Sequence, residues 1–149
     1  DLVGVAGSTG KKSRLLKESS HYAVRYWAAV GLHASGRGSA ALNSALQDTS
    51  PPVRIQAAEA LLQRGDNPEA LEVLVHDLKG NDLDVVLLAA RGLQLLGEKA
   101  RPALPQIRAA QKRAASNSDP ISLFIDFATT MYLVELGEIK KAAVFPSFR

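Results

Sequence analysis

Residues 48–65, DTSPPVRIQAAEALLQRG, have the pattern of a single amphipathic helix. Val53, Ala57 and Leu61 follow one another at intervals of four residues, so they fall on one helix face. A second apolar line runs beside this face, and small alanines in the middle would let neighbouring helices approach closely. The segment therefore predicts a helix that other helices cover on two sides, as in a stacked array.

Both ends of this segment carry helix boundary signals. Ser50 can cap the N-terminus with its side chain, and Pro51 suits the first turn, where a missing backbone N–H costs nothing. Gly65 is predicted to end the helix in the left-handed conformation that glycine adopts most readily. The sequence thus predicts one helix with defined limits.

The same pattern occurs in three further copies, at residues 19–36, 80–97 and 118–137. Each copy closes on a glycine, and the closing glycines follow one another at roughly 30 to 40 residues, the spacing of helical repeat arrays. When these glycines are aligned, two columns of apolar residues coincide. The columns are Val24, Val53, Val85 and Ile125, and Leu32, Leu61, Leu93 and Leu133.

Between the copies lie shorter amphipathic segments that predict return helices, so that each repeat is a helix pair. We expect an all-α fold, a right-handed α-solenoid (α-α superhelix) of three to four helix pairs, forming one domain over residues 1–149. A short helix is expected within residues 11–18, and a helix is expected to start near Pro105. The predicted segments are an incomplete leading repeat (1–18), four repeats (19–47, 48–79, 80–114 and 115–139) and a tail (140–149).

Composition limits the function classes only broadly. The chain has 149 residues, 46% of them hydrophobic, a formal net charge of +3 and no cysteine. Disulfides, thiolate zinc sites and a cysteine nucleophile are therefore excluded, and the small charge does not itself indicate nucleic-acid binding. No apolar run approaches the roughly 20 residues of a membrane span. The first ten residues lack the basic and hydrophobic regions of a signal peptide. Because the sequence begins with Asp1 and not with Met, we expect a fragment of a longer protein.

The motif D-x-x-P-x-V-R-x-x-A-A-x-A-L-x-x-x-G in residues 48–65 resembles the HEAT repeat family, and the resemblance covers residues 19–137. In that family the Asp and Arg of the motif commonly bridge adjacent repeats. The resemblance implies this inter-repeat role for Arg25, Asp48 and Arg54. Val86 and Asp126 replace the arginine in the later copies, so the ladder is expected to be incomplete.

Three segments resemble more narrowly the C-terminal HEAT extension of some bacterial arylsulfatase-type sulfatases. They are HYAVRYWAAVGL (21–32), PPVRIQAAEALLQRGDNPEALEVLVHDLK (51–79) and LLGEKARPALPQIRAAQ (95–111). The resemblance implies a non-catalytic accessory domain whose partner is an N-terminal hydrolase domain of the same parent chain. If this resemblance holds, it implies a periplasmic or extracellular location. The sequence itself does not indicate a compartment.

Candidate catalytic and metal-binding residues have simpler structural explanations. Residues 50–54, SPPVR, fit the S-x-P-x-R pattern of a sulfatase nucleophile, but a cap, two prolines and a core valine explain them equally well. Glu69, Glu72 and His76 share a helix face without a fourth metal ligand, which is typical of a solvated face. His21 and His33 lie near helix ends, where capping or exposure is expected. We predict no catalytic, cofactor or metal site and no enzymatic activity for this chain.

A basic segment keeps nucleic-acid binding open as an alternative. Arg101, Arg108 and Lys112 recur along the third return helix, with Arg113 beside them. Glu98 interrupts the series and no aromatic residues interleave with it, which favours a solvated helix face. A HEAT-like lyase is a second alternative, and it rests on the shared repeat alone.

A comparison of copies indicates a surface for a protein partner. A stripe predicted to face water is polar in the second copy and apolar in the first. We therefore predict partner contacts at Tyr26, Trp27 and Val30, unless a helix in residues 11–18 covers them. The favoured function is a protein-interaction or structural module, with no membrane role. The two stripes are Gln56, Glu59 and Gln63 in the second copy and Trp27, Val30 and Ala34 in the first.

Overall fold

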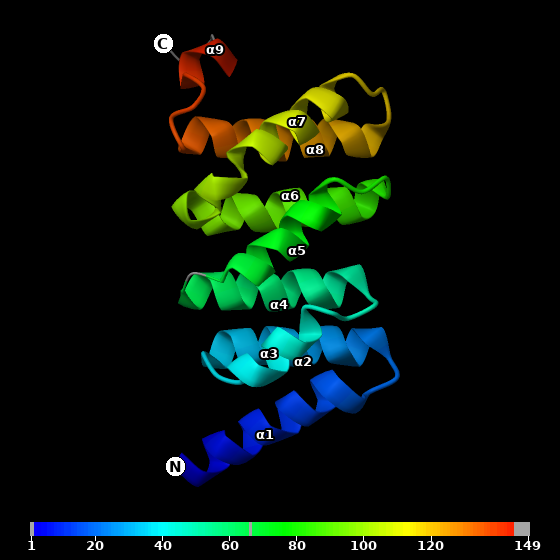
Figure 1. Ribbon diagram of the computed structural model, residues 1–149, viewed down its shortest axis with the longest axis vertical. Helices are drawn as coiled ribbons and strands as arrows, with labels where there is room; N and C mark the ends of the chain where they lie inside the picture. The colour runs from blue at the N-terminus through cyan, green and yellow to red at the C-terminus, as the bar shows by residue number, and fades with distance from the viewer. Residues whose placement is uncertain (1, 66, 145–149) are drawn as a thin grey trace. The chain divides into compact units, whose positions relative to one another are not determined.

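The computed structural model describes residues 2–65 and 67–144, and every regular element within them is a helix (Figure 1). The predicted all-α fold of paired helices is confirmed. The chain divides into two compact units, Asp1–Leu74 and Val75–Arg149, and the division falls inside one helix, α5 (Pro68–Leu78). The expectation of a single domain over residues 1–149 stays a prediction.

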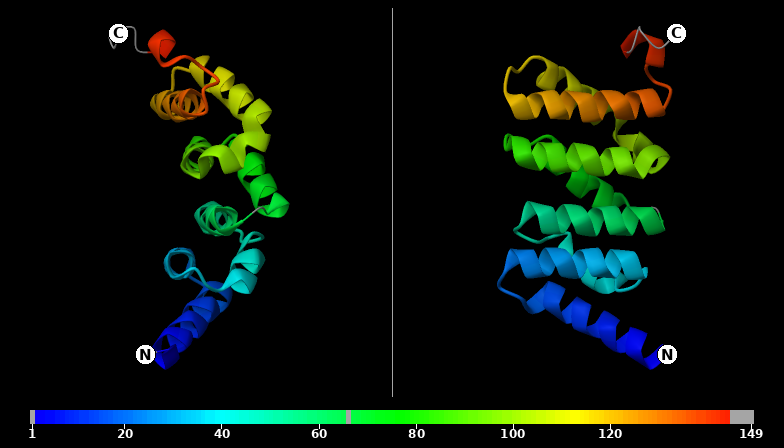
Figure 2. Two further views of the ribbon diagram at one scale, coloured as in Figure 1. Left: turned by 90° about the vertical axis from the view of Figure 1, so that its left-hand side faces the viewer. Right: turned by 180° about the vertical axis from the view of Figure 1, so that it is seen from behind.

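The first unit contains α1, α2, α3 and α4 and the beginning of α5. Helices α2 and α4 lie side by side in one layer, and α3 lies in a second layer against α4 (Figure 2). Its core includes Leu32 and Val53 of the aligned columns and Ala57 of α4, all fully buried, whereas Val24 of the valine column is 39% exposed. The helices are α1 (Leu2–Glu18), α2 (Tyr22–Ser35), α3 (Ser39–Ala45) and α4 (Pro51–Arg64).

The second unit repeats this two-layer arrangement with α6 and α8 side by side and α7 packed against α8 (Figure 2). Its core includes Leu93 and Leu133 from the aligned leucine column, together with Ile107 of α7. As predicted, the second helix of the third pair starts next to Pro105, at Leu104. The elements are α6 (Leu83–Leu96), the 3₁₀ helix η1 (Gly97–Ala103), α7 (Leu104–Ala115), α8 (Pro120–Glu135) and α9 (Lys141–Val144).

The end signals of α4 differ from the prediction at both termini. The side chain of Ser50 makes no capping hydrogen bond. The Oδ1 atom of Asp48 instead accepts a hydrogen bond from the Ser50 amide at 2.8 Å. Gly65 has a φ of 170° and is extended, not left-handed.

Elsewhere local signals set the helix ends. The side chain of Asn67 accepts a hydrogen bond from the Ala70 amide at 3.0 Å, and that of Asp119 accepts one from the Ile121 amide at 2.8 Å. Gly36 ends α2 in the left-handed region, with a φ of 65°. A short polar side chain before a helix and a glycine after it are therefore sufficient signals at these positions.

The leading helix is longer than predicted, because α1 spans Leu2–Glu18 and not only residues 11–18. Its glycines lower the intrinsic helix propensity, which is why the sequence pattern did not indicate a helix there. Packing of α1 against α2 and α3, with Leu16 buried, favours the helical conformation. In the predicted tail 140–149, α9 forms a short helix, and residues 145–149 lie outside the described residues.

None of the helices in the described part of the chain combines the length and the apolarity that a membrane crossing requires.

Candidate interaction surfaces and inter-repeat contacts

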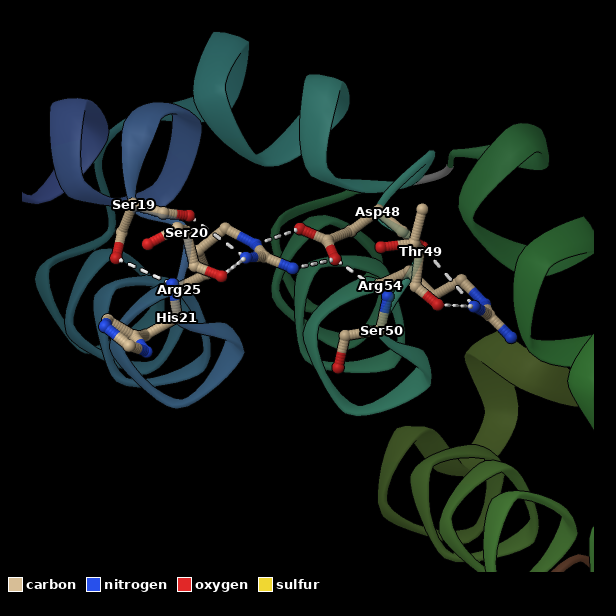
Figure 3. Close-up of polar contacts among 8 residues, drawn as sticks. All are labelled: Ser19, Ser20, His21, Arg25, Asp48, Thr49, Ser50 and Arg54. Carbon is tan, nitrogen blue, oxygen red and sulfur yellow. Dashed lines mark hydrogen bonds and ion pairs between the residues drawn. The ribbon is translucent and has the colours of Figure 1, made fainter.

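The three residues predicted to bridge repeats meet at the start of α2 and α4 (Figure 3). The Nε and Nη2 atoms of Arg25 donate hydrogen bonds to the two carboxylate oxygens of Asp48 at 2.7 and 2.9 Å. The side chains of the pair are only 14% and 10% exposed. Arg25 belongs to α2 and Asp48 to the turn before α4, so the ion pair connects two repeats.

Arg25 and Arg54 also make the same kind of contact with the backbone (Figure 3). Each uses its Nη1 atom to donate to two carbonyl oxygens in the turn that precedes its own helix. This contact holds each turn against the first turns of the helix that follows. The acceptors are Ser19 and Ser20, at 3.0 and 3.2 Å, for Arg25, and Asp48 and Thr49, at 3.3 and 3.2 Å, for Arg54.

The surroundings of Asp48 favour its charged form. Desolvation would by itself raise the pKa of this carboxyl group, but hydrogen bonds from Arg25 and from the Ser50 amide lower the pKa below its ordinary value. The hydrogen bond to Asp48 correspondingly raises the pKa of Arg25. Both groups are therefore ionised at neutral pH, as a charge-assisted bidentate pair requires.

His33 connects α2 to α4, a role that the sequence analysis missed. Its Nδ1 atom lies 2.9 Å from the side-chain nitrogen of Gln56, and its Nε2 atom lies 2.9 Å from the side-chain oxygen of Gln63. A neutral imidazole with its proton on Nε2 satisfies both contacts. Sequence spacing could not reveal this bridge, because the partners belong to different helices.

The bridge corrects the prediction that Gln56, Glu59 and Gln63 form a water-facing stripe. Gln56 and Gln63 face the preceding helix, α2. Glu59 is half-buried, and this burial raises the pKa of its carboxyl group to about 7. Gln56 and Glu59 are half-buried, so the prediction is wrong at these two positions, whereas Gln63 is exposed as predicted although it also contacts His33.

Two arginines bind the C-terminal ends of helices other than their own. Nη2 of Arg64, in α4, donates to the Leu32 carbonyl near the end of α2 at 2.6 Å. In the second unit, Nη2 of Arg113 donates to the Leu78 carbonyl at 2.7 Å. The last carbonyls of a helix have no partner within that helix, so a guanidinium there stabilises the helix end.

The predicted partner residues of α2 differ in exposure. Trp27 is 68% exposed, whereas Tyr26 and Val30 are half-buried. The rings of Tyr26 and Trp27 meet edge to face, with their centroids 5.4 Å apart. These positions are compatible with partner binding, and the partner contact itself stays a prediction.

The leading helix lies beside Trp27 without burying it. The aliphatic chain of Lys12 in α1 packs closely against Gly31 of α2. A Cβ atom added to Gly31 would lie only 3.1 Å from the Lys12 side chain. An apolar groove of about 350 Å³ separates α1 from Trp27. Coverage by a leading helix is therefore partial. The groove is lined by Lys12, Leu15, Ala23, Val24, Trp27 and Ala28.

Two basic residues of the second unit, Arg101 and Arg108, are joined to carboxylates. Arg101 forms two hydrogen bonds with Glu98, at 2.6 and 2.8 Å, and a third with Glu138 at 3.0 Å. Arg108 donates to the other oxygen of Glu138 at 2.6 Å. This network balances two of the charges that suggested a nucleic-acid surface.

An apolar face on α8, which the sequence analysis did not identify, carries two exposed aromatic residues, Phe124 and Phe127. Leu123, Phe124 and Phe127 are 64%, 63% and 60% exposed. Their positions in the sequence could have indicated this exposure, because they fall outside the aligned apolar columns of the fourth copy. We call these three residues the α8 apolar face.

The remaining candidate chemistry has structural partners. In the SPPVR segment, Val53 is fully buried and Arg54 bonds to backbone carbonyls. Glu69 accepts a hydrogen bond from Gln47 at 3.2 Å, and His76 contacts Asp77 at 3.1 Å. Among the residues that the structure describes, no three His, Asp or Glu side chains are grouped to hold a metal ion.

Comparison with known families agrees with this architecture. A family model described as HEAT repeats matches residues 13–94, which is more than half of the chain. No curated protein matches the sequence.

Proposed function

Because the chain belongs to the HEAT repeat family, we propose that it is a non-catalytic helical repeat module that binds another protein. The observation that carries the proposal is the exposure of large aromatic side chains on ordered helices, with Trp27 on α2 and Phe127 on α8. Grouped apolar side chains on a folded surface are typical of protein contacts, and aromatic residues often dominate their binding energy.

The absence of catalysis is part of the proposal. Its support is that the residues with reactive potential already serve the fold. His33 bridges α2 and α4, and Asp48 binds Arg25 while holding the Ser50 amide. To act on a substrate, His33 or Asp48 would have to break these contacts between repeats.

Affinity capture tests the main proposal. The full chain and a Trp27→Ser/Phe127→Ser double variant are immobilised, and proteins retained from an extract of the source organism are quantified. We expect a protein that the original chain retains and the variant loses, while the control variant Glu72→Gln retains it. Retention of the same proteins by all three chains would contradict the proposal.

A second experiment distinguishes protein binding from nucleic-acid binding. The pairing of Arg101 and Arg108 with Glu98 and Glu138 weighs against it. A mixed-sequence DNA duplex titrated at two salt concentrations gives the answer. Binding that weakens steeply with salt would favour a nucleic-acid module, because phosphate contacts release counterions.

A finer proposal is that the chain is the C-terminal accessory domain of a sulfatase-like hydrolase. Its support is the resemblance of residues 21–32, 51–79 and 95–111 to such extensions. The coding sequence upstream of Asp1 tests it: a sulfatase domain there would support the proposal, and an unrelated protein would contradict it. The isolated chain should not hydrolyse aryl sulfates.

A further inference from the structure

Leu123 and Phe127 of the α8 apolar face lie on the side of the helix that, in α2 and α6, faces the next long helix. In the first unit, Ala29 of α2 is fully buried, and His33 beside it bonds to α4. In the second unit, Ala90 of α6 is buried, and Gln94 bonds to Glu135 of α8 at 3.1 Å. The same helix face therefore receives the next long helix in both units.

Alignment on the closing glycines identifies the residues of α8 that are equivalent to this face. Thr130 takes the position of Ala29 and Ala90, and Val134 that of His33 and Gln94. Phe127 and Leu123 lie on the same face, at the positions of Tyr26 and Tyr22 of α2. In α8, Phe127 and Leu123 are 60% and 64% exposed, whereas at the corresponding positions of α2 Tyr26 is half-buried and Tyr22 is 60% exposed. The position that α4 partly covers on α2 is therefore left bare on α8 at Phe127.

The charge on this face is the reverse of that on α2. Arg25 of α2 binds Asp48, which lies two residues before Ser50, the N-cap residue of α4. The position of Arg25 is occupied in α8 by Asp126. Asp126 is half-buried, and its side chain accepts a hydrogen bond from Thr130 at 3.3 Å. A helix that lay on α8 as α4 lies on α2 would therefore place its pre-helical residue near a carboxylate.

We propose that the α8 apolar face binds an amphipathic helix of a partner protein, and that this helix carries a lysine or arginine just before its first turn. The apolar side chains supply the contact area, and Asp126 selects the positive charge. The proposal rests on the proposed function of the chain as a protein-binding module and specifies one of its surfaces. Continuity with the covered faces of α2 and α6 defines the geometry, and the charge at Asp126 defines the partner's chemistry.

Two synthetic helix-forming peptides test the proposal on the full chain. They have the same leucine-lined face and differ only in the residue two positions before the helix cap, which is Lys in one peptide and Glu in the other. Fluorescence anisotropy gives their dissociation constants. We expect the Lys peptide to bind about 10-fold more tightly, and Asp126→Lys to reverse that preference.

Substitutions in apolar residues locate the binding. Phe127→Ser should raise the dissociation constants of both peptides about 10-fold or more, because it removes an exposed aromatic side chain from the binding face. Leu95→Ser is the matched control, since Leu95 is similarly exposed on α6 and lies outside the α8 apolar face. Circular dichroism of each variant confirms that the helices are retained.

Three results would overturn the proposal. Binding that Phe127→Ser leaves unchanged but Trp27→Ser abolishes would move the site to α2, and the protein-binding function would stand. Failure of both peptides to bind would remove the α8 site, while affinity capture with the full chain decides the function separately. Concentration-dependent self-association that Phe127→Ser abolishes, measured by sedimentation, would assign the face to a second copy of the chain instead.

Discussion

Arg25 and Asp48, one in a helix and the other in the turn before the next long helix, meet in a bidentate ion pair with distances of 2.7 and 2.9 Å. Asp48 also accepts the amide hydrogen bond of Ser50, where α4 begins. One carboxylate therefore both joins two repeats and positions the start of the second one. Its loss should affect the stability of the first unit more than an exposed ion pair would.

Asp48→Ala should lower the free energy of unfolding by about 2 kcal/mol, because it leaves the largely buried guanidinium of Arg25 without its anionic partner. Urea titrations followed by circular dichroism measure the change. Glu98→Ala is the matched control, since it removes a bidentate partner of Arg101 at an exposed site, and its effect should be much smaller. Equal effects of the two substitutions would contradict a special role for Asp48.

Glu59→Gln should change how stability depends on pH. Burial raises the pKa of Glu59 from 4.5 to about 7 in the folded chain. Between these values the folded state holds a proton that the unfolded state has released, so the free energy of unfolding falls as pH rises. The substitution should remove this fall and stabilise the chain at pH 8 by at most about 3 kcal/mol.

Urea midpoints at pH 4, 5, 6, 7 and 8 test the Glu59 prediction, with Glu72→Gln on the exposed side of α5 as the control. The control should keep the pH dependence of the original chain. If the Glu59→Gln chain still lost stability between pH 4.5 and 7, another group would be responsible.

His33→Ala should destabilise the chain by about 1 kcal/mol, because it removes two side-chain hydrogen bonds between α2 and α4. A double-mutant cycle with Gln56→Ala separates the bridge from other effects of the histidine. We expect the double variant to lose less than the sum of the two single losses. Strict additivity would mean that the bridge does not couple the helices.

Trp27→Ala should change the stability of this chain by no more than about 0.5 kcal/mol, because two thirds of the side chain is already exposed. Leu32→Ala, in the same helix but fully buried, should cost about 3 kcal/mol. Thermal unfolding compares the two. A loss for Trp27→Ala similar to that for Leu32→Ala would assign Trp27 to the core and remove it from the proposed contact surface.

Local sequence signals determined the helices themselves. The spacing of Val53, Ala57 and Leu61 recurs in the other copies, and the leucine column is buried in α2, α4, α6 and α8. In the other aligned column Val53 and Ile125 are buried, whereas Val24 is 39% exposed and Val85 is half-buried. Asn67 and Asp119, short polar residues directly before a proline, cap helices. These features could be predicted because helix periodicity and capping depend on residues within a few positions of one another.

The extent of α1 and the conformation of Gly65 could not be predicted in the same way. The glycines of α1 disfavour a helix by local propensity, and packing against α2 and α3 overrides that preference. Gly65 can adopt several backbone conformations of similar free energy, so its residue type alone does not select the extended one.

The sequence by itself determined a HEAT-type array of amphipathic helices and the Arg25 and Asp48 positions of its ladder. Only the tertiary structure decided that His33 binds Gln56, that Arg108 binds Glu138, and that Phe127 is exposed. The physical reason is that a polar side chain does not specify in sequence which distant partner it meets. Likewise, apolar residues of a repeated column are alike in sequence whether or not a neighbouring helix covers them.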